Sequence, residues 1–175
     1  MRYLRTMAVA AMFFCLGLVL PFATGQIKVI GTMLLPMHLP VMIAGFALGG
    51  PWGAVVGALT PIMRSLLFPF PILYPNAVCM AFELAAYGFT TGLLYRRWKG
   101  PKALRIYGPL VCAMLTGRLV WGLAQTILVG LFGKGFSLAA FWAGAFATAL
   151  PGVVLQLVVV PLVVYALEKA GYLHK

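Results

Sequence analysis

Of the 175 residues, 63% are hydrophobic and 9% are charged, and the mean hydropathy is +1.04, values typical of a chain surrounded by lipid rather than water. The only acidic residues, Glu83 and Glu168, leave little material for catalysis by paired carboxylates. The net charge of +11 does not indicate nucleic-acid binding, because the basic residues lie between long apolar runs and not on one solvent-facing surface.

Hydrophobic segments separated by Pro, Gly and charged residues divide the chain, and a helix needs roughly 20 apolar residues to span a bilayer. We expect the first segment to be retained as a membrane helix and not cleaved as a signal sequence. The second is too short to cross unless irregular backbone completes the span. Pro151 divides the last apolar region, 138–170, into a short helix and a spanning helix. The other expected segments are 3–22, 39–48, 51–68, 76–95 and 107–132.

These segments predict an all-α integral membrane protein. It forms one transmembrane domain over residues 1–175, a six-helix bundle with a short second helix and a broken C-terminal helical region. Short loops rich in Lys and Arg lie on the cytoplasmic side of a membrane. In this topology Lys28 and Lys134 fall on the other side, so we expect both termini to be cytoplasmic and ligand capture to occur outside. The cytoplasmic set is Arg2, Arg5, Arg96, Arg97, Lys99, Lys102, Arg105, Lys169 and Lys175.

Three charged residues, Arg64, Glu83 and Arg118, lie inside predicted spans, where each costs at least about 2.5 kcal/mol unless it faces the bundle interior and finds a partner. Helical spacing places polar and aromatic side chains on common faces, in the outer half of the bundle. An apolar site with a few converging polar groups is the usual form of a small-molecule site. The candidate substrate-binding residues are Arg64, Glu83, Arg118, Gln125, Gln156, His38, Tyr74, Asn76, Met80 and Trp121.

Two arginines against one glutamate leave one positive charge over, which favours an anionic ligand because a guanidinium suits a carboxylate or phosphate. The alternative is that Arg64 or Arg118 pairs with Glu83 only as a link between helices. His38 is also explained as a loop residue that forms hydrogen bonds, and Tyr74 and Asn76 as interfacial and helix-capping residues.

Other classes of function find little support. The cysteines, Cys15, Cys79 and Cys112, lie singly in apolar runs, so we expect neither a metal site nor a cofactor. An enzyme would have only Glu83 and His38 to use, and a channel would need polar residues along a whole pore. There is no GxxxxGK[ST] motif, so active uptake requires partner subunits that hydrolyse ATP.

Small residues recur at the four-residue interval that lets helices approach closely in lipid. They are Gly45, Gly49, Gly53 and Gly57, then Gly88 and Gly92, and more weakly Thr6 and Ala10. The alternative is that these residues serve only the internal packing of this bundle, because such patterns are common in all membrane helices. As candidates for contact with a coupling subunit we take Thr6, Ala10, Gly49 and Gly53.

Several short stretches, in this order and spacing, resemble the S components of energy-coupling factor (ECF) transporters, and the likeness covers nearly the whole chain. The first is the run from Leu35-Pro36-Met37-His38-Leu39-Pro40 to Gly45-Phe46, which continues into Gly49-Gly50-Pro51-Trp52-Gly53. The later stretches are Thr60-Pro61 with Arg64-Ser65, Tyr74-Pro75, Met80-Ala81-Phe82-Glu83-Leu84 with Tyr87-Gly88, and Ala149-Leu150-Pro151-Gly152 with Leu155-Gln156.

This resemblance implies a substrate-binding subunit in a prokaryotic cell membrane, not an enzyme, that encloses a vitamin or precursor at its outer face. It implies a T component and two ABC-type ATPase subunits as partners. It further implies that a small-residue face on the first helix contacts the T component, for which Thr6 and Ala10 are the nearest match. The motifs look most like the pantothenate-type branch, which would suit the surplus arginine, while riboflavin, thiamine, folate and pyridoxine stay open.

Overall fold

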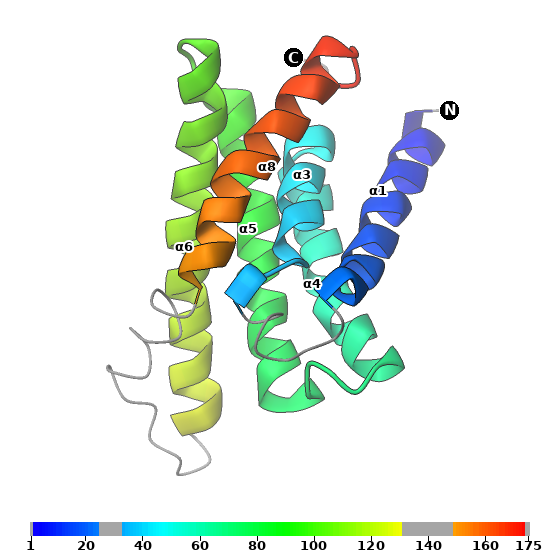
Figure 1. The fold of residues 1–175 in the computed structure, drawn as a ribbon, viewed down its shortest axis with the longest axis vertical. Helices are drawn as coiled ribbons and strands as arrows, with labels where there is room; N and C mark the ends of the chain where they lie inside the picture. Colours follow the sequence, from blue (N-terminus) through cyan, green and yellow to red (C-terminus); the bar gives the residue numbers. More distant parts are fainter. Residues whose placement is uncertain (1, 25–32, 131–148, 174–175) are drawn as a thin grey trace.

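The computed structural model describes residues 2–24, 33–130 and 149–173, and this part of the chain is helical without any strand. The described residues form six α-helices, which are drawn in Figure 1. A 3₁₀ turn, η1 (Leu20–Thr24), follows the first helix, and an irregular helical turn, η2 (Leu73–Ala77), precedes α5. The predicted all-α fold is confirmed. The helices are α1 (Arg2–Val19), α3 (His38–Leu48), α4 (Gly50–Leu67), α5 (Val78–Arg97), α6 (Lys102–Gly130) and α8 (Leu150–Lys169).

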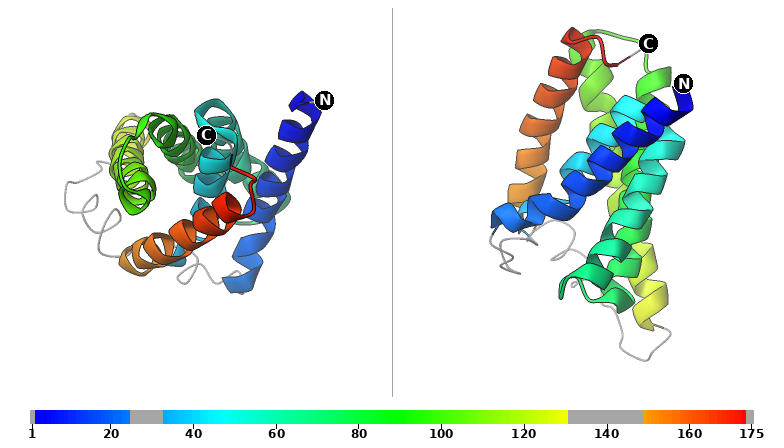
Figure 2. Two further views of the ribbon diagram at one scale, coloured as in Figure 1. Left: turned by 90° about the horizontal axis from the view of Figure 1, so that it is seen from above. Right: turned by 90° about the vertical axis from the view of Figure 1, so that its right-hand side faces the viewer.

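Successive long helices run in opposite directions, so that α1 begins and α8 ends at the same end of the bundle (Figures 1 and 2). We call this the terminal end and the opposite one the distal end. α3 and α8 both run from the distal end toward the terminal end. The predicted short helix before Pro151, together with Lys28 and Lys134, lies outside the described residues.

Four helical stretches are long and apolar enough to cross a membrane: Tyr3–Ala23, Leu73–Arg97, Lys102–Val129 and Leu150–Lys169. α3 has 11 residues, and at about 1.5 Å per residue it covers only part of the roughly 30 Å hydrocarbon layer. The short second helix was predicted correctly. The backbone before it begins a turn at Leu35, whose φ is +50°, and the His38 amide donates to the Leu35 carbonyl at 3.0 Å.

Two helices extend further into the basic stretch than the sequence predicted. Arg96 and Arg97 belong to α5, and Lys102 and Arg105 belong to α6, which leaves only residues 98–101 outside the helices. Arg and Lys are good helix formers, and their long side chains keep the charge near water when the helix end reaches the interface. Charge therefore marked the end of the apolar layer and not the end of the helix.

Glycines bring α3, α4 and α5 into backbone contact at the centre of the bundle. A Cβ on Gly53 would lie 2.5 Å from the Gly88 carbonyl oxygen and 2.7 Å from the Gly45 Cα, distances that real side chains do not reach. Gly49 has a φ of +95°, the left-handed conformation that glycine adopts readily, and it forms the turn between α3 and α4. Internal packing thus accounts for Gly53, while contact of Gly49 or Gly53 with another subunit stays a prediction.

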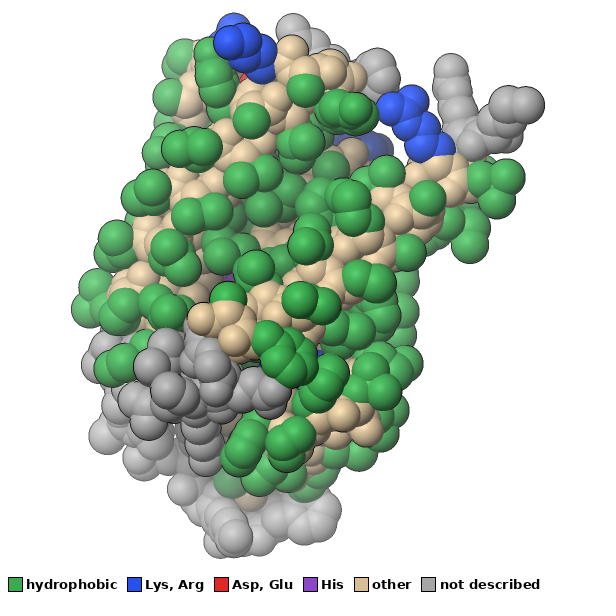
Figure 3. Space-filling view, turned by 45° about the vertical axis from the view of Figure 1, so that its right-hand side comes forward, with side chains coloured by type: hydrophobic (Ala, Val, Ile, Leu, Met, Phe, Trp, Pro, Cys, Tyr) green, Lys and Arg blue, Asp and Glu red, His purple; other side chains and the backbone are tan. Residues whose placement is uncertain are grey.

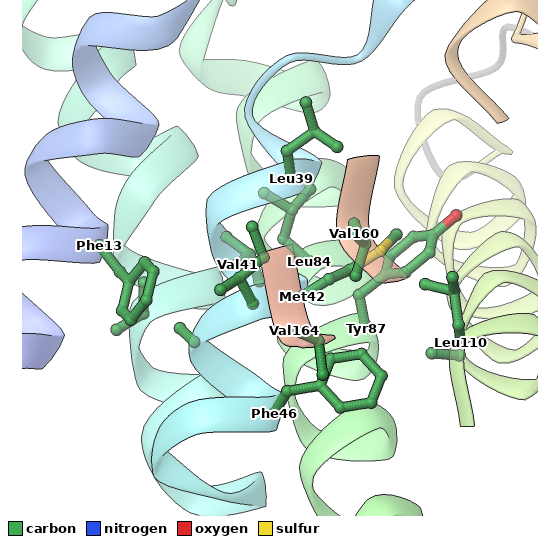
Figure 4. Packing of buried hydrophobic residues seen from close by; sticks show 14 of the residues in the cluster. Phe13, Leu39, Val41, Met42, Phe46, Leu84, Tyr87, Leu110, Val160 and Val164 are labelled. Atoms are coloured by element: carbon green, nitrogen blue, oxygen red, sulfur yellow. The ribbon is translucent and has the colours of Figure 1, made fainter. Parts of the chain in front are cut away.

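The buried apolar core lies around α3 and α5. Figure 4 shows Met42 and Tyr87 beside Val160 and Val164 of α8, with Leu110 of α6 next to Tyr87. These five side chains are almost fully buried. The core therefore joins α8 and α6 to the glycine-packed centre.

A polar cluster ties three helices together at the terminal end. Glu168 of α8 accepts a hydrogen bond from Arg105 of α6 at 2.7 Å and another from the Tyr95 hydroxyl of α5. The Arg105 guanidinium also donates to that hydroxyl at 3.0 Å and lies 4.9 Å from the Tyr95 ring centroid. The Glu168 carboxylate is thereby paired with Arg105.

Gly88→Ala should destabilise the bundle, because the new Cβ would lie 3.0 Å from the Gly53 Cα and closer still to its carbonyl. Overpacking of this kind costs about 1–3 kcal/mol, so the melting temperature of the purified protein in micelles should fall. Ala8→Val, on the exposed side of α1, is the control and should leave it unchanged. Equal melting temperatures for Gly88→Ala and the wild type would show that α4 and α5 do not touch there.

Candidate ligand-binding site

Three polar side chains from three helices converge inside the bundle. His38 begins α3, Glu83 lies on α5 and Arg118 lies on α6. The Arg118 Nη1 atom is 3.0 Å from Glu83 Oε1, and His38 Nε2 is 3.5 Å from the same oxygen. The three residues are 1%, 2% and 6% exposed, in the order His38, Glu83, Arg118. We call this set, with Tyr87 described next, the buried polar cluster.

Tyr87 completes the cluster as its aromatic wall. It lies one turn after Glu83 on α5, is fully buried, and interacts electrostatically with both Glu83 and Arg118. Its ring packs edge-on against the His38 imidazole, with 5.2 Å between the ring centroids. Gly117 of α6 makes room for it, because a Cβ there would overlap the Tyr87 ring. Tyr87 was not among the sequence-predicted candidates, although its position four residues after Glu83 was a signal that could have found it.

Several buried atoms of the cluster, and those of Gln156 on α8, have no hydrogen-bond partner among the described residues. They are both imidazole nitrogens of His38, Nε and Nη2 of Arg118, and both amide atoms of Gln156. Glu83 Oε1 also has no partner with hydrogen-bond geometry, so its contact with Arg118 is an ion pair by distance alone. Buried polar atoms without partners are costly and rare in native proteins. Their concentration here marks the region as a candidate binding site.

Gln156 faces the interior from α8 and is fully buried. It lies on the same helix face as Gly152 and Val160, one turn from each. A Cβ on Gly152 would lie 2.6 Å from the Met33 carbonyl oxygen, so α8 begins beside the segment that leads into α3. Gln156 follows Gly152 by one turn, so it lies one turn further along α8 from this contact.

Arg64 occupies a different environment. It is 4% exposed, and its Nη1 donates to the Leu18 carbonyl near the end of α1 at 2.5 Å. Its guanidinium carbon lies 5.3 Å from the Phe22 ring centroid and 5.0 Å from that of Phe68. The cation thus satisfies a carbonyl at a helix C-terminus, where positive charge is favoured. It makes no ion pair with Glu83, which Arg118 neutralises instead.

The remaining candidates lie toward the distal end. The Tyr74 hydroxyl in η2 donates to the Leu128 carbonyl of α6 at 2.7 Å, and both Tyr74 and Asn76 are exposed. Met80 is partly buried against the apolar core, and Trp121 and Gln125 follow Arg118 on α6 and are partly buried. Substrate contact for these five residues stays a prediction.

Of the predicted coupling residues on α1, Ala10 is buried and Thr6 is partly buried. Ala10 belongs to the wall of an apolar groove of about 190 Å³ between α1 and α4. Met7, Ala11 and Phe14 line the α1 side of this groove, which also includes Trp52, Val55, Val56 and Leu59 of α4.

The fold and the site together define a multi-pass membrane protein with a polar cluster enclosed by apolar helices. The family model of the ECF transporter substrate-specific component matches residues 5–164, and the chain belongs to this family. Membership assigns it to membrane uptake of a vitamin or related micronutrient, as a substrate-binding subunit that works with T and ATPase modules and not as an enzyme. The match does not support the pantothenate-type branch. Neither the curated proteins nor the solved structures include a significant match to the chain.

Arg118→Met should destabilise the protein by about 3–5 kcal/mol, because it leaves the Glu83 carboxylate buried without its counter-charge. The double variant Glu83→Leu/Arg118→Met should recover much of that loss, measured by denaturant unfolding in micelles. Arg105→Met is the matched control and should cost less, since the Arg105 and Glu168 side chains are 21% and 20% exposed and water supports the remaining charge. Strictly additive losses in the double variant would contradict the pairing of Glu83 with Arg118.

Proposed function

We propose that this chain captures a small micronutrient from the outer side of a prokaryotic cell membrane at the buried polar cluster, and that the captured molecule enters the cell by ATP-driven transport. The observation that carries this proposal is the convergence of His38, Glu83 and Arg118, with nitrogen atoms that have no partner among the described residues, inside an apolar bundle. Polar groups in a membrane interior are expensive and mark substrate sites.

Capture from outside is supported by the distribution of charge. Lys and Arg side chains gather at the terminal end of the face drawn in Figure 3, while the other described residues on that face are largely hydrophobic. Basic residues mark the cytoplasmic side of a membrane protein, so the distal end is the outer one. His38 begins α3 on the distal side of this helix. A ligand arriving from outside would therefore meet the cluster before the packed core.

Transport needs partners, for which the groove between α1 and α4 is our proposed contact. It is apolar, is lined partly by exposed side chains such as Met7 and Leu59, and includes Ala10, one of the small residues expected to meet a T component. An apolar helix from a membrane partner would fill such a groove by van der Waals packing, the main force between helices in lipid. Two ATPase subunits would then supply the energy.

An anionic ligand such as pantothenate is a second candidate, and Arg64 is the residue that favours it. The sequence has two carboxylate side chains, which the described residues pair with Arg118 and Arg105. Arg64 has no carboxylate partner in the described part of the chain. A carboxylate of the ligand would replace the carbonyl contact of its guanidinium with a charge-assisted hydrogen bond.

Purification of the chain, followed by mass spectrometry of bound small molecules, tests capture directly. The wild type should retain a micronutrient, and cells should accumulate that compound only when the T component and ATPases are also expressed. Glu83→Gln should lower retention by at least about tenfold, because it removes a charged hydrogen-bond acceptor worth about 1.5–3 kcal/mol. The matched change Glu168→Gln, at the terminal end, should retain the compound.

A small membrane enzyme or a channel that acts without ATPase partners is the alternative function. Accumulation independent of the ATPases would support a channel, and a chemically altered product would support an enzyme. A chain that retains no small molecule and binds no ATPase subunits would contradict the proposed function.

The anionic candidate has its own test, titration of pantothenate into the purified protein by calorimetry. Arg64→Gln should weaken binding by about 10- to 100-fold, the loss expected for one hydrogen bond to a charged group. Arg64→Lys keeps the charge but loses the planar fork, and should weaken binding less. Pantothenate affinity that is absent in the wild type, or unchanged in Arg64→Gln, would rule this candidate out.

A further inference from the structure

We propose that the buried polar cluster recognises an uncharged group of the ligand that presents an N–H donor beside a C=O acceptor, as a carboxamide or lactam does, with Glu83 accepting and Arg118 donating. The inference rests on the proposed function, because it concerns the chemistry of the ligand at the same site. It does not depend on the charge that the ligand carries elsewhere.

The Glu83 and Arg118 side chains together carry no net charge. Glu83 and Arg118 bring one negative and one positive charge within 3.0 Å of each other, both almost fully buried. A second carboxylate bound there would share one guanidinium with Glu83, and two carboxylates close together away from water repel strongly. A cation would meet the Arg118 charge in the same way. The cluster is therefore selective for groups without net charge.

The hydrogen-bond donors of Arg118 and the acceptor of Glu83 match the two polar groups of an amide. Nε and Nη2 of Arg118 form one edge of the guanidinium, and neither has a partner among the described residues. That edge donates to a carbonyl oxygen, while the Glu83 carboxylate accepts an N–H beside it. An amide offers these two groups side by side. Each bond includes one charged partner, so both are stronger than bonds between neutral groups.

Further polar and aromatic groups lie beside Glu83 and Arg118. The imidazole of His38 lies 3.5 Å from Glu83 and has two nitrogens without partners among the described residues, so it offers one more donor and one more acceptor when neutral. The Tyr87 ring stands edge-on to it and supplies an aromatic surface. Gln156 of α8 is fully buried and has an amide group without a partner among the described residues. These groups suit a flat ligand with more than one amide-like edge.

The test compares three probes of the same size class on the purified wild-type chain: benzamide, benzoate and N,N-dimethylbenzamide. We would measure their affinities by calorimetry at pH 8, where benzoate carries its negative charge. Benzamide should bind at least about tenfold more tightly than benzoate, and by a similar factor more tightly than the dimethyl compound, which lacks the N–H donor.

Glu83→Gln should reverse the preference, because it leaves the Arg118 charge uncompensated and makes the site attractive to benzoate. Glu168→Gln makes the same chemical change in the other arginine-paired glutamate, and should keep the wild-type order. If Glu83→Gln does not fold, as judged by circular dichroism, the three affinities of the wild type decide the question alone.

Tighter or equal binding of benzoate by the wild type, or no binding of benzamide at millimolar concentration, would overturn the inference. A chain that retains a micronutrient and supports uptake, yet shows no preference for benzamide, would overturn the inference alone. A wild-type chain that neither retains a micronutrient nor supports its uptake would instead overturn the proposed function.

Discussion

The carboxylate of Glu83 sets a condition that the rest of the bundle has to meet. A buried charge in an apolar interior needs a counter-charge and hydrogen-bonding groups around it. Arg118 supplies the counter-charge from α6, at 3.0 Å, and His38 approaches from α3 at 3.5 Å. The arrangement of α3, α5 and α6 around this point is thus the structural basis of the candidate site.

The position of the polar cluster depends on the glycine packing. Close contact of Gly53 with Gly88 and Gly45 holds α3 and α4 against α5. α3 is short, so His38 begins it inside the bundle and not at the membrane surface. Small residues therefore act indirectly on the site, because they determine how near His38 comes to Glu83.

The two arginines illustrate how environment separates residues of the same type. Arg118 meets a carboxylate, whereas Arg64 meets a backbone carbonyl and two aromatic rings near the end of α1. Arg118 balances the negative charge of Glu83 in the polar cluster, whereas Arg64 carries a positive charge that no carboxylate of the described residues balances.

Hydropathy alone determined the helical class, the short second helix and the membrane location, because lipid allows few other ways to satisfy the backbone. Helical spacing also identified Glu83 and Arg118 as inward-facing. The sequence could not decide which arginine pairs with Glu83, since spacing gives the face of a helix but not its neighbour. Only the tertiary structure brought His38 to Glu83 and directed Arg64 to Leu18. These contacts join segments far apart in the chain, and their distances follow from how closely the helices pack.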